Sequence, residues 1–295
     1  MPELPEVETT VLDLKKAQPS ILGAGFIDVW TDWKKIVKKP KSFAKFKKEI
    51  IGRKILNIRR RGKNILIDLS KNKVLLIHQK LTGHLLLGKW KFENGKWKSL
   101  IPGPLADDPM NKFLHLIFFL DDGRQLALSD LRKFAKIEFW DKDNLENSKE
   151  FKSLGPEPLE KDFTFEKFKR ILTKQRKKIK QVLMDQKIIA GIGNIYSDEI
   201  LWRAKVSPLK ISSTLSEIEL KRIYQSMKEI LKTAIEVKGE SISDFRRISG
   251  EKGGFDPLRQ VYRREGEKCK RCGAIIKRIK IGGRSAHYCP VCQKM

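Results

Sequence analysis

The chain has 295 residues, enough for two modest domains with separate cores, and 40% are hydrophobic, which excludes large-scale disorder. Its 63 Lys and Arg exceed its 36 Asp and Glu, giving a formal net charge of +27 that favours a polyanionic partner, although general Lys enrichment is an alternative reading. No apolar run approaches the roughly 18 residues of a membrane span, and the acidic start MPELPEVETT is unlike a secretory signal.

The first predicted element is a helix that begins after Pro5. Pro5 suits a first helical position, and acidic residues follow it at the positive end of the helix. We expect this helix to pack against a core and to hold Pro2 and Glu3 in a fixed place. One face is apolar or nearly so, because suitable side chains recur at i, i+3, i+4 and i+7, namely Val7, Thr10, Val11 and Leu14.

Short strand-like runs follow from about residue 25 to 140, separated by glycine and Asp-Gly turns. Many strands without intervening helices predict a sandwich or barrel. The polar, charged stretch 141–158 is a candidate linker. The predicted strands are Ile55–Ile58, Ile65–Leu69, Val74–Ile77, Leu85–Trp90, Phe113–Leu120, Gln125–Leu128 and Lys136–Trp140.

The second half of the chain reads as helical until its last 30 residues, which return to short strands around the cysteines. The sequence shows neither an internal repeat nor a low-complexity tract, only Lys-rich patches such as 174–180. The predicted helices are Phe165–Leu172, Ile179–Ile189, Ile195–Ala204 and Ser216–Val237.

All four cysteines lie near the C-terminus as two CxxC pairs, Cys269 with Cys272 and Cys289 with Cys292. Four thiolates at this spacing predict a closed tetrahedral site for one structural Zn²⁺, with no open position for catalysis. Two redox CxxC motifs are the alternative, but the βαβ context that they need is missing. Since these cysteines do not form a disulfide framework, a reducing cytosolic compartment fits best.

Between the two pairs, Gly282-Gly283 separates two strand-like runs, which predicts a hairpin whose tip presents Arg284. A guanidinium there suits bidentate contact with a phosphate, although an exposed hairpin arginine is more often only solvated. A zinc ribbon by itself does not specify a function.

Two other features are compatible with DNA binding. Gly191-Ile192-Gly193-Asn194 separates two predicted helices, and Asn194 is a suitable N-cap at what would be an anion-binding helix start. An ordinary capped helix hairpin remains the alternative. The cluster Arg59–Lys63 enters an apolar strand, where Lys63 is a candidate phosphate ligand and a solvated charged face is the plain reading.

Several separated segments, running in order along the whole chain, resemble one family, the formamidopyrimidine-DNA glycosylases. They are Pro2-Glu3-Leu4-Pro5-Glu6-Val7-Glu8, Arg61-Gly62-Lys63, Asp130-Leu131-Arg132-Lys133-Phe134, Leu154-Gly155-Pro156-Glu157-Pro158-Leu159, Asp185-Gln186-Lys187 with Gly191-Ile192-Gly193-Asn194-Ile195-Tyr196, and Val261-Tyr262-Arg263-Arg264-Glu265-Gly266.

The resemblance implies a bifunctional glycosylase and lyase of base excision repair that removes oxidised purines. Once Met1 has been removed, the secondary amine of Pro2 would attack C1′ of the damaged nucleotide and expel the base. The resulting iminium would favour loss of the phosphates by β- and then δ-elimination. Glu3 matches the general acid/base that protonates the sugar ring oxygen. The resemblance also implies catalytic roles for Lys63 and Arg284.

The resemblance also implies how the chain engages double-stranded DNA that carries an oxidised base or an abasic site. Arg132 and Phe134 would fill the space left by the flipped base, and Lys63, Asn194 and Arg284 would contact phosphates. Residues 247–255 correspond to a lid. One position departs from the family pattern, because Leu81 stands where the third void-filling residue is commonly Met within His-Leu-x-Met, which puts opposite-base discrimination in doubt.

The implied architecture is an α+β, multi-domain fold. It combines an N-terminal helix and antiparallel β-sandwich (1–142), a linker (143–163), a helix–two-turn–helix domain (164–256) and a zinc-ribbon hairpin (257–295). We expect a monomer in the cytoplasm, associated with the nucleoid and not with a membrane. The alternatives are an endonuclease VIII-like glycosylase for oxidised pyrimidines and a catalytically silent DNA-binding zinc protein.

Overall fold

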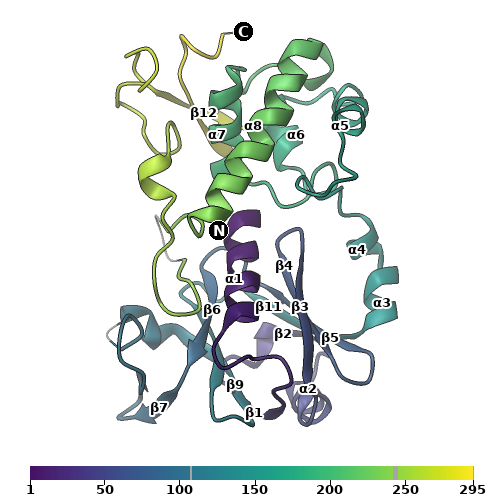
Figure 1. Ribbon diagram of the computed structural model, residues 1–295, viewed down its shortest axis with the longest axis vertical. Coiled ribbons are helices and arrows are strands. Elements are labelled where there is room, and N and C mark those ends of the chain that lie inside the picture. The colour runs from purple at the N-terminus through teal and green to yellow at the C-terminus, as the bar shows by residue number, and fades with distance from the viewer. Residues whose placement is uncertain (107, 242–244, 295) are drawn as a thin grey trace. The chain divides into compact units, whose positions relative to one another are not determined.

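The structure is a computed structural model that describes residues 1–106, 108–241 and 245–294 (Figure 1). The chain forms two compact units. The first unit comprises Met1–Lys152 and Val237–Gly254, and the second unit comprises Ser153–Glu236 and Phe255–Met295. The segment Val237–Gly254 therefore belongs with the N-terminal half, and the four-part division expected from the sequence stays a prediction.

The first unit begins with helix α1 (Leu4–Lys16), which Figure 1 draws in purple. Pro5 occupies the second helical position, one place later than expected, because the helix already starts at Leu4. The periodic apolar face packs into the core as predicted, and Val7 and Leu14 are fully buried there. Glu6 in the first turn and Lys15 and Lys16 in the last turn complement the helix dipole.

Two sheets form the body of the first unit, with strand orders β1-β9-β10-β6 and β2-β11-β5-β4-β3. The core between them is a single apolar cluster to which α1 contributes. The sandwich is antiparallel as expected except at one edge, where β2 pairs parallel to β11. The strands are β1 (Phe26–Thr31), β2 (Val37–Lys39), β3 (Ile55–Arg61), β4 (Asn64–Leu69), β5 (Lys73–His78), β6 (Gly83–Gly88), β9 (Leu114–Leu120), β10 (Gln125–Asp130) and β11 (Lys136–Asp141).

The predicted strand Leu85–Trp90 is two elements, because β6 ends at Gly88 and Trp90 starts a separate hairpin of β7 (Trp90–Glu93) and β8 (Lys96–Ser99). A side chain at Gly88 would meet the Trp90 ring at 2.7 Å, so the indole folds back over the strand end. Phe113 closes the short helix η2 (Pro109–Phe113) and does not begin β9.

The α-helices α2 (Phe43–Ile50), α3 (Lys142–Asn147) and α4 (Lys149–Lys152) of the first unit had no counterpart in the sequence-based expectation. Helix α2 starts at the Ser42 cap, and only two of its side chains are buried. The first part of the candidate linker is helical, as α3 and α4.

The second unit contains helices α5 (Phe165–Leu172), α6 (Ile179–Met184), α7 (Asn194–Ala204) and α8 (Glu217–Glu236), followed by the hairpin of β12 (Lys277–Ile281) and β13 (Arg284–Tyr288). Helix α6 is five residues shorter than predicted. Its end has a local cause, since the Asp185 side chain accepts the Lys187 N–H at 3.0 Å and competes with a further helical turn. Within the described ranges, no helix combines the length and the apolarity needed to cross a membrane.

Candidate functional site

The N-terminus of the first unit is held by two glutamates in a reciprocal capping arrangement. Glu3 is the N-cap of α1, its side chain accepts the backbone N–H of Glu6, and the Glu6 carboxylate accepts the Glu3 N–H at 2.7 Å. Both side chains are 1% exposed. Pro2 is buried directly before this cap, and its nitrogen is still the amide of Met1. The helix start therefore fixes the two residues expected to carry the chemistry.

Glu6 also connects the cap to the returning segment of the first unit. Its second carboxylate oxygen accepts the backbone N–H of Glu240 at 2.8 Å. Gly239 has a φ of +79°, and a side chain there would approach the same oxygen at 2.9 Å, so glycine is required. Further along, Arg247 pairs with Asp13 of α1 at 2.9 Å. The returning segment of the first unit thus contacts α1 at two places, at Glu240 and at Arg247, and Arg247 lies at the start of the expected lid.

Lys63 lies in the two-residue turn between β3 and β4, where Gly62 supplies a φ of +57°. Its side chain is largely buried, with 7% exposed. Arg60 of β3 bonds to Glu8 of α1 at 2.7 Å and to the Gly62 carbonyl at 3.0 Å. The same guanidinium therefore contacts helix α1 and the turn that carries Lys63. The alternative that Lys63 belongs to a solvated charged face therefore does not hold, because its side chain is buried.

His78, at the end of β5, has a strongly shifted pKa that the sequence did not indicate. Burial is the main cause that lowers its pKa to about 3, and the positive charges of Lys80, Lys136 and Lys63 act in the same direction. Its Nδ1 accepts the Lys80 N–H at 3.0 Å. His78 is therefore a neutral imidazole at physiological pH, and with Nδ1 accepting, its Nε2–H is the remaining donor.

The residues expected to fill the void lie on two loops at the same end of the sandwich. Leu81 is half-buried in the turn between β5 and β6. Arg132 and Phe134 lie in the turn between β10 and β11, where Phe134 is 49% exposed and the Arg132 guanidinium lies 4.7 Å from its ring centre. Strands β6 and β10 are neighbours, with Gly83 opposite Asp130, so the structure brings the two turns together.

Asn194 is not the N-cap of α7, contrary to the expectation. The cap is Gly193, and Asn194 is the first helical residue, half-buried, with an Oδ1 that has no hydrogen-bond partner within the described chain. The turn before it is held by the Gln186 side chain, which accepts the Gly191 N–H at 2.8 Å and donates to the Ile192 carbonyl at 2.7 Å. The Asn194 Oδ1 is a buried acceptor that remains open to another partner.

A buried charge network fixes the start of α7 and the zinc hairpin within the second unit. Lys180 donates to the Asn194 carbonyl at 3.4 Å and pairs with Asp198, and both of these charged side chains are almost fully buried. The other Asp198 oxygen accepts the His287 backbone N–H at 2.9 Å. The hairpin therefore has a defined position on the helices of its own unit.

Arg284 begins β13, directly after the turn Gly282-Gly283, whose φ angles of +55° and +78° match a type I′ hairpin turn. A side chain at Gly282 would meet the Gln181 amide of α6 at 2.5 Å, so the tip lies against that helix. Arg284 itself is exposed and makes no ion pair within the described part of the chain. Its guanidinium is available to a ligand.

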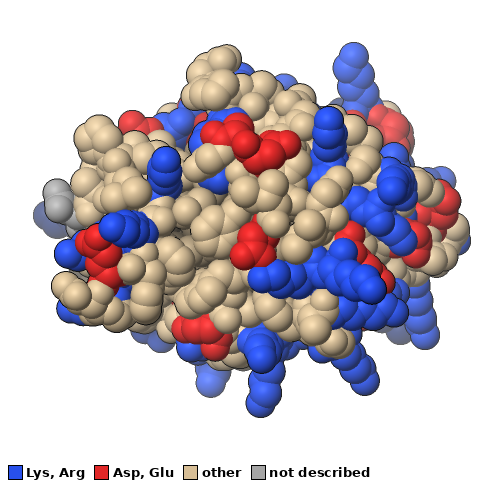
Figure 2. Space-filling view, turned by 90° about the horizontal axis from the view of Figure 1, so that it is seen from below, with Lys and Arg blue, Asp and Glu red and all other residues tan. Residues whose placement is uncertain are grey.

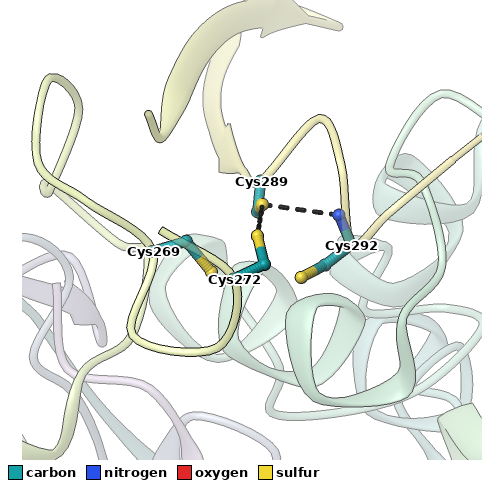
Figure 3. A group of neighbouring side chains, drawn as sticks. All are labelled: Cys269, Cys272, Cys289 and Cys292. Atoms are coloured by element: carbon teal, nitrogen blue, oxygen red, sulfur yellow. Dashed lines mark hydrogen bonds between the residues drawn. The ribbon is translucent and has the colours of Figure 1, made fainter. Parts of the chain in front are cut away.

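The four cysteines converge as the spacing predicted. Their sulfur atoms lie within 4.8 Å of one another, with side chains pointing inward from two loops (Figure 3). Tetrahedral Zn–S bonds of about 2.3 Å place sulfur atoms about 3.8 Å apart, so the residues fit Zn²⁺. Burial and the neighbouring Cys272 and Cys289 raise the pKa of Cys292 to about 12, a penalty that a bound cation removes.

The surface carries the charge excess expected from the composition. Figure 2 shows Lys and Arg side chains projecting from much of the face that it draws, with Asp and Glu in smaller groups between them. Some acidic side chains of the chain are paired with basic neighbours, as in the ion pair of Lys47 with Asp28 at 2.5 Å. The remaining positive charge suits a polyanion.

Comparisons with known proteins agree along the whole chain. Residues 1–137 match the formamidopyrimidine-DNA glycosylase N-terminal domain, residues 154–246 match the formamidopyrimidine-DNA glycosylase H2TH domain, and residues 266–294 match the zinc finger found in FPG and IleRS. A formamidopyrimidine-DNA glycosylase of Pelotomaculum thermopropionicum is 39% identical over 295 residues and covers all of both chains.

Two crystal structures of the Lactococcus lactis enzyme are similar at 36% identity, each covering 99% of this chain and 100% of the other. One is a complex of Fpg with DNA containing an abasic site, at a TM-score of 0.85. The other is a complex of FPG (MutM) with DNA containing FAPY-dG, at a TM-score of 0.84. With the cysteine cluster and the capped N-terminus, these matches leave one conclusion: the chain belongs to the formamidopyrimidine-DNA glycosylase family.

Proposed function

We propose that this protein is a bifunctional DNA glycosylase and abasic-site lyase that removes oxidised purines, with Pro2 as its nucleophile. The observation that carries the proposal is the capped helix start, where Glu3 and Glu6 bond to each other's backbone and hold Pro2 directly before them. A nucleophile works when its position relative to the proton donor is fixed before substrate arrives. Family membership supplies the substrate class, oxidised purines in duplex DNA.

The proposed reaction starts when Met1 is removed, because only then is the Pro2 nitrogen a secondary amine. Its lone pair forms a bond to C1′, and the glycosidic C–N bond breaks as the base leaves with a proton. Glu3 protonates the ring oxygen as the sugar opens. Loss of a C2′ proton passes the C–H electron pair to the Pro2 iminium, and the electron pair then expels the 3′ phosphate as the C3′–O bond breaks. Loss of the C4′ proton expels the 5′ phosphate in the same way as the C5′–O bond breaks, and water finally hydrolyses the iminium and frees the Pro2 amine.

The remaining roles are assigned by charge and position. Lys63, Asn194 and Arg284 contact phosphates beside the lesion, as a charge or amide at a turn favours. Leu81, Arg132 and Phe134 occupy the space left by the flipped base. Because the substrate is chromosomal DNA and the zinc ligands are thiolates, we also propose the reducing cytoplasm, at the nucleoid, as the site of action.

Borohydride trapping tests the proposal. The Met1-free protein, incubated with a duplex containing 8-oxoguanine and sodium borohydride, should form a covalent complex, and peptide mass analysis should place the adduct on Pro2. Glu3→Gln keeps the volume and one capping oxygen and serves as the matched variant, with slower trapping expected. A Met1-free protein that forms no adduct, or one trapped on a lysine, contradicts the assignment.

A lesion panel separates the purine specificity from its rival, an endonuclease VIII-like preference for oxidised pyrimidines. Duplexes with 8-oxoguanine, a formamidopyrimidine or an oxidised pyrimidine should be compared under single-turnover conditions. Faster excision of the two purine lesions supports the proposal, and faster excision of the pyrimidine supports the rival. Binding without any excision would support a catalytically silent DNA-binding protein.

A further inference from the structure

The two turns that carry the void-filling residues share one buried polar link. The Thr82 hydroxyl, next to Leu81, donates to the carboxylate of Asp130, which ends β10. Thr82 is 8% exposed and Asp130 is fully buried. Forty-eight residues separate the two in sequence. Neither side chain is at the surface, so their link acts on the turns and not directly on a ligand.

The same carboxylate organises the second turn. Asp130 accepts the backbone N–H groups of Phe134 and Ala135, both at 2.7 Å, and that of Arg132 at 3.3 Å. The Arg132 N–H also reaches the Thr82 hydroxyl oxygen, at 3.1 Å. The Thr82 hydroxyl thus donates to the Asp130 carboxylate and accepts the Arg132 backbone N–H, so it bonds to the second turn in two ways. Hydrogen bonds that involve a charged group are stronger than neutral ones.

The turns are also packed without a gap. A side chain at Gly83 would lie 3.2 Å from the Ala135 side chain and 2.5 Å from the Gln79 carbonyl. Each turn contains a lysine in the left-handed region, Lys80 at a φ of +56° and Lys133 at +54°. Such residues persist where the surroundings determine the backbone.

The residue at the start of the Leu81 turn, Gln79, is in an unfavourable environment. Gln79 is 1% exposed, and neither its amide nitrogen nor its amide oxygen has a hydrogen-bond partner among the described residues. A buried amide without a partner costs free energy. The turn therefore depends on contacts elsewhere to keep its conformation, and the Thr82 hydroxyl provides a side-chain contact to the other turn.

We propose that Thr82 and Asp130 are positioning residues that make the two void-filling turns act as one element, so that Leu81 enters the duplex in register with Arg132 and Phe134. The inference rests on the proposed function of these three residues. Leu81 is smaller in reach than the methionine common in the family, so its placement depends more on the turn. Loss of the Thr82 hydroxyl should weaken extrusion of the base while the chemistry at Pro2 persists.

Thr82→Val tests this inference because it removes the hydroxyl and keeps the shape. Single-turnover excision of 8-oxoguanine from a duplex should fall about tenfold, as expected for a lost bond to a charged group. Borohydride trapping on a preformed abasic site, where no base must leave the stack, should stay within about twofold. Thr82→Ser should restore excision. Ser129→Ala is the matched control, since Ser129 is a buried neighbour whose hydroxyl donates to Met110 at 3.0 Å.

A double-mutant cycle separates positioning from general stability. If Thr82 acts through Leu81, Thr82→Val should cost little further excision in a Leu81→Ala background. The inference would be overturned if the two substitutions reduced the excision rate multiplicatively. It would also be overturned if Thr82→Val slowed the reaction equally on 8-oxoguanine and abasic DNA, or did not slow excision at all. Should Thr82→Val unfold at the assay temperature, Thr82→Ala at a lower temperature gives the same comparison.

The experiment also distinguishes failure of the proposed function. A Met1-free wild-type protein that cannot be trapped on abasic DNA refutes the chemistry, and the inference falls with it. Normal trapping with full excision by both Leu81→Ala and Phe134→Ala leaves the chemistry intact and refutes the void-filling roles, which also overturns the inference.

Discussion

The Arg60 guanidinium bonds to the Glu8 carboxylate at 2.7 Å and thereby connects strand β3 to helix α1. The Arg60 side chain is only 8% exposed, and it bonds to the Gly62 carbonyl in the Lys63 turn at the same time. Arg60 is therefore a direct polar link between the helix that follows Pro2 and Glu3 and the turn that carries Lys63.

Replacing Arg60 should affect both stability and reaction. Arg60→Ala leaves the partly buried Glu8 without this partner, and we expect a loss of about 1–3 kcal/mol in the free energy of unfolding. Trapping on abasic DNA should slow, since Lys63 is no longer fixed relative to α1. Denaturant unfolding and trapping rates give both quantities. Lys45→Ala is the control, because its pair with Glu49 is exposed, and equal effects of the two substitutions would contradict the prediction.

Retention of Met1 should abolish trapping, because the Pro2 nitrogen is then an amide without a nucleophilic lone pair. A preparation containing both forms should give an adduct only from the lighter one in intact-mass analysis. DNA binding by the two forms should be similar, since the DNA contacts proposed do not involve the amine. An adduct that retains Met1 would show that another residue attacks.

The proposed phosphate contacts should be visible in the salt dependence of binding. Lys63→Ala and Arg284→Ala should each reduce the slope of log K against log salt by about 1, with similar losses on damaged and undamaged duplexes. Arg278→Ala is the matched control in the same hairpin, since that side chain already contacts Glu265 at 3.5 Å. A loss confined to one DNA sequence would count against phosphate contact.

Removal of zinc should unfold the C-terminal hairpin, because four crowded thiols replace a metal centre that contributes to folding. A strong chelator, or Cys272→Ser, should lower the melting temperature and weaken DNA binding, and added Zn²⁺ should restore the chelated protein but not the variant. Metal analysis should find about one Zn²⁺ per chain, as four ligands imply. Unchanged melting of a metal-free sample would refute this role.

His78 should make the protein sensitive to acid. Its folded pKa of about 3 lies below the ordinary value of 6.5, so the unfolded chain binds a proton that the folded chain does not. This contribution to stability is complete above about pH 6.5 and declines as the pH falls toward 3. His78→Gln should therefore lose less melting temperature than wild type between pH 7.5 and 5. An imidazole NMR titration near 6.5 for His78 would contradict the prediction.

Local patterns predicted much of the fold. Helix α5 matches at both ends because Thr164 caps it and its apolar spacing is regular. Helix α2 was missed because its Lys-rich sequence buries only Phe46 and Ile50. Asn194 looked like a cap, yet the backbone turns at Gly193. The first miss reflects the small buried face of α2, and the second reflects the non-helical backbone at Gly193, which the sequence pattern did not distinguish from that of Asn194.

The candidate site, too, was predictable only in part. The motifs that contain Pro2, Lys63 and Arg132 could be recognised because the residues of each motif are contiguous in the sequence. The link between Thr82 and Asp130 could not, since it joins positions 48 residues apart that meet only when β6 pairs with β10. The contact of Arg60 with Glu8 likewise needs a helix and a strand to be placed together.

The reciprocal bonds of Glu3 and Glu6 have an evolutionary consequence. The side chain at position 3 has to meet two requirements at once, because it caps helix α1 and is proposed to transfer a proton. A substitution that is acceptable for capping, such as Ser or Asp, shortens the reach of the carboxyl or removes it. Gln preserves the reach and one capping oxygen but cannot give up a proton as a carboxylic acid does, and Glu6 must in addition hold the Glu240 N–H. Each of the two positions therefore tolerates few substitutions, and this buried helix start should vary less among relatives than the surface.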